Sequence, residues 1–129
     1  MENTIKHSNF EQGPPIDEGL VTWLDAEAIG RRIQLPIEIY SGPLGIESSY
    51  LRAGNTEIEI DLDTTAMSLD LPMQLKPYCS SYPCRVWLEG TWGALISDSP
   101  QENLPVFAVR MVVGIASEHE TNIRFPKSL

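Results

Sequence analysis

The stretch RRIQLPIEIYSG, residues 31–42, decides the fold of this 129-residue chain. Within it, from residue 32 to residue 40, every second position carries an aliphatic side chain, while charged, amide, proline or tyrosine residues occupy the other positions; the aliphatic set is Ile33, Leu35, Ile37 and Ile39. A period of two predicts a β-strand with one buried face and one solvated face. Pro36 lies on the polar side and cannot donate a ladder hydrogen bond, so we expect this strand at a sheet edge or bulged at that residue.

A hairpin is predicted next along the chain, over SSYLRAGNTEIEIDLD at residues 48–63. Gly54 and Asn55 can adopt positive φ between two runs of strand-forming residues. The second run alternates, with Ile58, Ile60 and Leu62 expected to point inward. Its other face would then carry a row of acids: Glu57, Glu59, Asp61 and Asp63.

Two further strands are predicted toward the C-terminus. The first is CRVWLEGTWGAL, residues 84–95, in which Gly90 indicates a bulge or bend. The second is LPVFAVRMVVGIAS, residues 104–117, with Arg110 on the solvated face because an unpaired guanidinium is rarely buried. We expect one shared buried face in this strand, made of Phe107, Val109, Met111, Val113 and Ile115.

One short helix is predicted between residues 17 and 30, with Asp17 as its cap and Gly30 as its left-handed end. Its apolar stripe is Leu20, Val21, Trp23, Leu24 and Ala28. Residues 64–78, TTAMSLDLPMQLKPY, fit either a strand or a helical turn, and we favour the helical turn.

Together these segments predict a mainly β protein, a five- or six-stranded antiparallel barrel with one or two short helices. Three strands, a helical connection and two strands over residues 30–116 resemble the OB-fold in element order, without any family motif. A six-stranded sandwich or another barrel fits if residues 64–78 form a strand. We expect a flexible N-terminal arm at 1–15, one domain at 16–117 and a C-terminal tail at 118–129.

The charge balance bears on the class of partner. Eighteen acidic and nine basic side chains give a net charge of −9, which disfavours binding to nucleic acid or to anionic membranes. We find no leader sequence and no apolar stretch long enough to span a bilayer, so we expect a cytoplasmic protein with no membrane association.

The two cysteines, Cys79 and Cys84, have Pro83 between them and no histidine close by in sequence. Two thiols do not complete a zinc site, and four intervening residues do not make a redox CxxC motif. We expect reduced structural thiols, because the cytosol is reducing. A disulfide is the alternative, and a reactive thiol is the least favoured interpretation.

The sequence carries no catalytic constellation, and we expect no cofactor and no metal. Its two histidines, His7 and His119, fall in the expected arm and tail. Neighbouring acids of the row are about 7 Å apart on one strand, too far to chelate one cation without help from another strand or loop. We interpret the row as a solvated face, with a docking surface for a basic protein as the first alternative and a cation site as the second; Arg52 is its expected cross-strand partner.

Trp87 shares the strand phase of Arg85 and Glu89, so it is the best candidate for an exposed aromatic anchor; partial burial under a loop or helix is the alternative. The leading hypothesis is a non-enzymatic, acidic β-barrel module that binds another protein through Trp87 and the acidic row, for instance an inhibitor or immunity-type protein. The alternatives are a domain that binds a small molecule or sugar, an enzyme that uses carboxylates in a barrel-end cleft, and a single-strand nucleic-acid binder.

Overall fold

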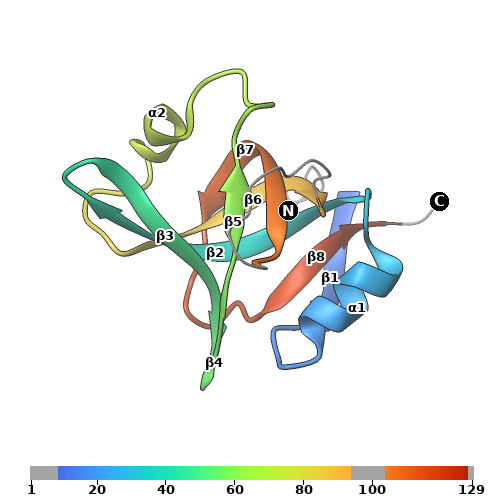
Figure 1. Cartoon of the computed structure of the whole chain (residues 1–129). Coiled ribbons are helices and arrows are strands. Elements are labelled where there is room, and N and C mark those ends of the chain that lie inside the picture. The colour runs from blue at the N-terminus through green and yellow to red at the C-terminus, as the bar shows by residue number, and fades with distance from the viewer. Residues whose placement is uncertain (1–8, 94–103, 128–129) are drawn as a thin grey trace, which may run out of the picture.

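The computed structural model describes residues 9–93 and 104–127 and shows a mainly β protein (Figure 1). Within these residues, two short helices accompany eight strands that join one sheet, which confirms the predicted class. The helices are α1 (Leu20–Glu27) and α2 (Leu71–Leu75). The strands are β1 (Phe10–Pro15), β2 (Arg32–Gly42), β3 (Gly45–Ala53), β4 (Thr56–Glu59), β5 (Asp61–Asp63), β6 (Cys84–Trp92), β7 (Val106–Ile115) and β8 (Asn122–Pro126).

The strand predicted first, β2, lies at the centre of the sheet. β6 runs antiparallel along one side of it, while the other side meets β8 where Gln34 faces Arg124 and then β3 from the pair Ile37 and Leu51 onward. Pro36 falls between these two neighbours. The expected edge position is therefore wrong, and a proline is tolerated in a central strand because the partner on one side changes at that residue.

The aliphatic face of β2 forms the middle of the core, as predicted. Ile33, Leu35, Ile37 and Ile39 are each 0% exposed. Helix α1 covers this core with its own buried side chains, and the indole nitrogen of Trp92 on β6 donates to Asp25 of α1 at 2.9 Å. Each fully buried aliphatic side chain contributes about 1.5–3 kcal/mol relative to exposure, so this face is a main source of stability.

The two helices begin in different ways. The Asp17 carboxylate accepts a hydrogen bond from the Gly19 amide at 2.9 Å in the turn before α1, and Gly19 itself is the N-cap, so the predicted capping role of Asp17 is wrong. Gly30 has φ of 80° just beyond α1, as expected. In α2, Asp70 is the N-cap and accepts from the Met73 amide at 3.3 Å, and the favoured helical turn in residues 64–78 is confirmed.

The sheet does not close into the expected barrel. β3, β2, β6, β7 and β5 follow one another around the core, but no ladder joins β3 to β5 in the described part of the chain. The predicted second arm of the hairpin splits at Ile60: β4 pairs with β3, whereas β5 runs parallel to β7. The architecture is thus an open, mixed sheet in place of an antiparallel barrel.

Both ends of the described chain belong to this sheet. β1 pairs antiparallel with β8, from Phe10 opposite Pro126 to Pro15 opposite Asn122. The expectation of a flexible arm and a tail outside the domain is therefore wrong at these residues, because both segments belong to the folded sheet. Short strands with a weak alternation, such as FEQGPP, give little signal in the sequence, because an edge strand need not bury a full apolar face.

Strand β7 departs from the single buried face predicted for it. It holds one extra residue, Arg110, between the partners of Glu89 and Gly90, and a second one between the partners of Trp87 and Leu88. Each bulge changes the phase of the strand. Met111 and Ile115 are consequently 46% and 57% exposed, and Val112 is buried in their place.

Gly90 is required where the first bulge forms. A Cβ at this position would lie 2.1 Å from the backbone oxygen of Ala108, whereas a Cβ on Gly114 of β7 would have nothing within 4 Å. We expect Gly90→Ala to lower the free energy of unfolding by about 1–3 kcal/mol, because the backbone of β7 must shift. Gly114→Ala should change it by less than about 0.5 kcal/mol. Urea unfolding of both variants checks this, and equal losses would contradict it.

Candidate functional site

Trp87 is not an exposed anchor. Its side chain is 3% exposed, the Arg124 guanidinium carbon lies 3.6 Å from its ring centroid, and its indole nitrogen donates to Glu120 at 3.2 Å. The prediction of exposure is therefore wrong, and the cover is a residue of strand β8, where the alternative had expected a loop or a helix. The sequence could not show this, because Arg124 belongs to β8, which the sequence pattern did not predict.

A chain of polar side chains continues from Trp87 across the face of the sheet opposite the core. Arg124 of β8 donates to the side-chain oxygen of Gln34 at 3.2 Å, and the Gln34 amide nitrogen donates to Glu89 at 3.0 Å. Glu89 in turn pairs with Arg32 at 3.0 Å. Gln34 is 5% exposed and bonded at both amide atoms, so this network joins β8, β2 and β6 without leaving a buried polar group unsatisfied.

The same face holds two more arginines, which are also engaged. Arg52 pairs with Glu38 and with Glu57, the latter at 3.1 Å, and its hydrogen bond to Glu38 raises its pKa. The predicted pairing of Arg52 with the acidic row is thus confirmed at Glu57. Arg85 donates to three backbone oxygens, and burial lowers its pKa. Arg52 and Arg85, like Arg32 and Arg124, are therefore compensated by acids or carbonyls among the described residues.

The acidic row keeps the predicted alternation but does not act as one unit. Ile60 is 2% exposed between two exposed acids, Glu59 and Asp61. Glu57 belongs to the Arg52 cluster, and Asp63 accepts hydrogen bonds from the amide and hydroxyl of Thr65. The two middle members of the row, Glu59 and Asp61, line a groove.

This groove lies between the first half of β3, strand β5 and the start of α2, and its volume is about 440 Å³. Its floor includes Ser49, Ile60 and Leu71, which are buried. Partly buried Ile46 and Leu62 pack against the core beside them. The groove is thus a place where the hydrophobic core approaches the surface, and we call it the β3–β5 groove.

Four carboxylates line the β3–β5 groove: Glu47, Glu59, Asp61 and Asp70. No lysine or arginine is found among the described residues around it, and none of these four acids forms an ion pair within the described ranges. Like charges lining one concave surface focus a negative potential on it. Sequence reasoning missed Glu47 and Asp70, since the turn after β2 and the cap of α2 come together only in three dimensions.

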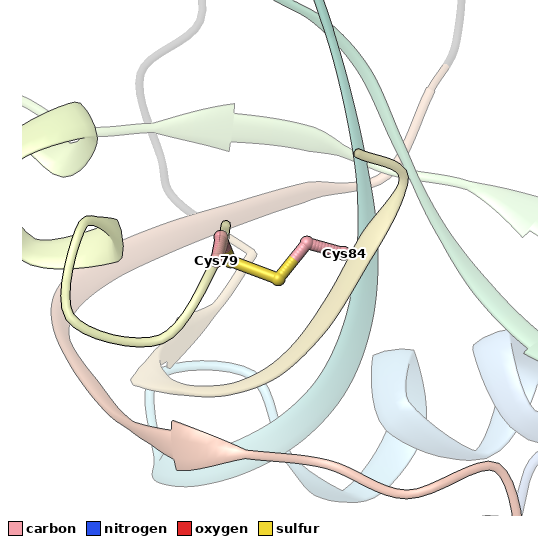
Figure 2. The surroundings of a disulfide bond; sticks show 2 residues. All are labelled: Cys79 and Cys84. Carbon is pink, nitrogen blue, oxygen red and sulfur yellow. A yellow bond between two sulfur atoms is a disulfide. The ribbon is translucent and has the colours of Figure 1, made fainter. Parts of the chain in front are cut away.

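Cys79 and Cys84 form a disulfide that links the segment after α2 to the start of β6 (Figure 2). Their Cα atoms are 5.8 Å apart, a usual separation for a bonded pair. The favoured expectation of reduced thiols is therefore wrong, and the alternative is the correct one. The bridged loop turns at a cis Tyr82–Pro83 peptide.

The structure bears on other classes of site as well. Across residues 9–93 and 104–127, no three histidine, cysteine or acidic side chains come together closely enough to hold a metal ion. His119 lies exposed in the turn before β8, and His7 is outside the described residues. None of the helices in the described ranges is long and apolar enough to cross a membrane.

Comparison of the chain with protein-family models, with curated proteins and with solved structures finds no match. Function must therefore be argued from the β3–β5 groove and from the distribution of charge around it.

The disulfide should stabilise the fold. Closing a loop of this length is worth about 2 kcal/mol by loop-closure entropy. We expect the double variant Cys79→Ala, Cys84→Ala, and the reduced wild type, to lose about this much free energy of unfolding. Urea titrations with and without dithiothreitol measure the loss, and the double variant should not respond to the reductant. A wild type that is equally stable in both conditions would contradict the bond.

Arg124 should keep Trp87 out of water. Removing its side chain in Arg124→Ala should lower the free energy of unfolding by about 1–2 kcal/mol, because the cation–π contact and two polar contacts are lost. The same change should raise acrylamide quenching of tryptophan fluorescence. Arg110→Ala removes an exposed arginine from β7 and serves as the control, with no change in quenching expected. Equal quenching in both variants would show that Arg124 does not shield the ring.

Proposed function

We propose that this chain is a non-enzymatic binding module that docks onto a basic surface of another protein through the β3–β5 groove. The observation that carries the proposal is the set of four carboxylates that line this groove without an ion-pair partner among the described residues. A cationic side chain placed there would meet carboxylates that pair with no lysine or arginine among the described residues.

The composition of the groove supports a protein partner. Its buried floor supplies apolar surface, whose removal from water gives about 25 cal/mol per Å². Its acidic rim attracts a basic partner and speeds the encounter of the two proteins. Salt weakens this attraction, because charges more than about 8 Å apart are largely screened at physiological ionic strength. A hydrophobic centre inside a charged rim is the usual organisation of a protein interface.

A specific form of this proposal is an inhibitor or immunity-type protein that neutralises a basic toxin or a basic nucleic-acid enzyme. The net charge of −9 supports it, because such targets carry positive surfaces that bind phosphate backbones. The distribution of arginines supports it too: Arg32, Arg52 and Arg124 pair with acids on the opposite, polar face, away from the groove.

Binding of a small organic cation is the second candidate function. A volume of about 440 Å³ falls within the range of small-molecule clefts, and acids converge on an apolar floor there. Calorimetric titration with spermidine separates the two candidates. Tight binding of spermidine that persists at 0.15 M salt would favour the small ligand, and weak, salt-sensitive binding would favour the protein partner.

Binding of single-stranded nucleic acid has less support. The rings of Trp87 and Trp92, which a single-strand binder could use for stacking on bases, are 3% and 1% exposed. Stacking needs exposed ring faces within a positive groove, and the arginines of the polar face already have partners.

The disulfide also bears on the compartment. Disulfides persist in oxidising environments and are rare in the reducing cytosol. We infer that the protein acts in an oxidising compartment, in place of the cytoplasm that we expected from the sequence. Thiol titration of the denatured protein, taken directly from its source cells, should find no free thiol without reductant and two with it. Two free thiols without reductant would support the cytoplasm.

Charge reversal of the groove tests the protein-binding proposal. We expect immobilised wild type to retain basic proteins from a native lysate at low salt and to release them as salt rises. Glu59→Lys with Asp61→Lys should abolish this retention. The matched control, Glu18→Lys with Glu27→Lys, changes the net charge equally at two exposed positions on or next to α1. Retention by the groove variant that equals that of the control would contradict the proposal.

A further inference from the structure

The β3–β5 groove lies where the sheet fails to close, between β3 and β5. β3 and β5 approach each other at one end of it, where the Ile60 amide donates to the Ser49 carbonyl at 2.9 Å and the Ser49 hydroxyl donates to the Ile60 carbonyl at 2.8 Å. Beyond this point the two strands form opposite walls of the groove. In the described part of the chain, residues 45–48 of β3 pair with β2 alone, and β5 pairs with β7 alone.

Two strand edges that have no ladder partner among residues 9–93 and 104–127 therefore face one groove. An unpaired edge presents a row of backbone N–H and C=O groups that can pair with another chain. Proteins use such edges for recognition by strand addition, in which main-chain hydrogen bonds give affinity and alternate side chains give specificity. A strand inserted here would complete the ring that runs through β3, β2, β6, β7 and β5.

We propose, on the basis of the protein-binding function above, that the partner inserts an extended basic segment between β3 and β5 as an added strand. The edge of β3 offers four residues, Gly45 to Ser48, and β5 offers three. The inserted segment therefore needs about four to six residues in extended form, at about 3.3 Å per residue.

The groove also sets the side-chain pattern of that segment. In a strand, successive side chains point to opposite faces. One set would rest on the apolar part of the floor, Ile60 and Leu71, and on Ile46 beside it, and the other would reach the rim carboxylates Glu59 and Asp61. The segment should thus alternate between β-branched apolar residues and lysine or arginine.

The probe is an eight-residue peptide of alternating valine and lysine with blocked ends, titrated calorimetrically into the full chain. Its control carries the same residues with N-methyl groups on alternate backbone nitrogens, which keeps charge and side chains but prevents pairing along one edge. We expect the methylated peptide to bind at least tenfold more weakly. Hydrogen exchange should slow in residues 45–48 and 61–63 when the parent peptide binds.

The protein variants keep the two proposals apart. Glu59→Lys with Asp61→Lys should abolish peptide binding, and Glu18→Lys with Glu27→Lys should preserve it. Equal affinity for the two peptides, no binding of either, or exchange protection elsewhere would overturn strand addition. In those cases the proposed docking function would still be supported if retention of the lysate proteins depends on Glu59 and Asp61. It would be contradicted if their retention does not depend on these two residues.

Discussion

The pairing of β2 with three other strands is the constraint on which the rest of the structure depends. Its four aliphatic side chains are 0% exposed, and its backbone joins β6 on one side and both β8 and β3 on the other. The change of partner at Pro36 divides the sheet into two regions. One region, with β8 and β1, packs near α1, and the other, with β3 and β4, has the β2–β3 turn on the side of α2 and β4 at its opposite end (Figure 1). The β3–β5 groove belongs to the second region, because β3 and β5 separate there.

The polar side of the same strands segregates charge. Four of the nine basic residues, Arg32, Arg52, Arg85 and Arg124, lie on the face opposite the core, and each has acidic or carbonyl partners. Burying a guanidinium requires such partners, because an unpaired charge away from water is costly. The acids around the groove are consequently left without these cations. The negative potential of the groove is thus a product of how the opposite face satisfies its arginines.

Two links fix the wall of the groove that α2 provides. The Gln74 side-chain oxygen accepts a hydrogen bond from the Val112 amide at 2.9 Å, next to the bulges of β7. The disulfide then anchors the segment after α2 to the start of β6. A helix of five residues has little stability of its own, so tertiary contacts hold it in place. These two links hold α2 in place within the fold itself, and a preformed surface lowers the entropic cost of binding.

The sequence by itself determined the mainly β class, the buried face of β2 and the alternation of the acidic row, because each of these depends on local periodicity. It also determined the hairpin at Gly54 and a bulge near Gly90, because each of these depends on the conformational freedom or the small size of one glycine. Tertiary structure alone decided that β5 runs parallel to β7, that the two ends of the chain pair, and that Arg124 covers Trp87. It also brought Glu47 and Asp70 beside Glu59 and Asp61. The physical reason is that a period of two tells which side of a strand is buried, but not which strand lies next to it. That choice comes from contacts between residues far apart in the chain, such as Gln34 with Arg124.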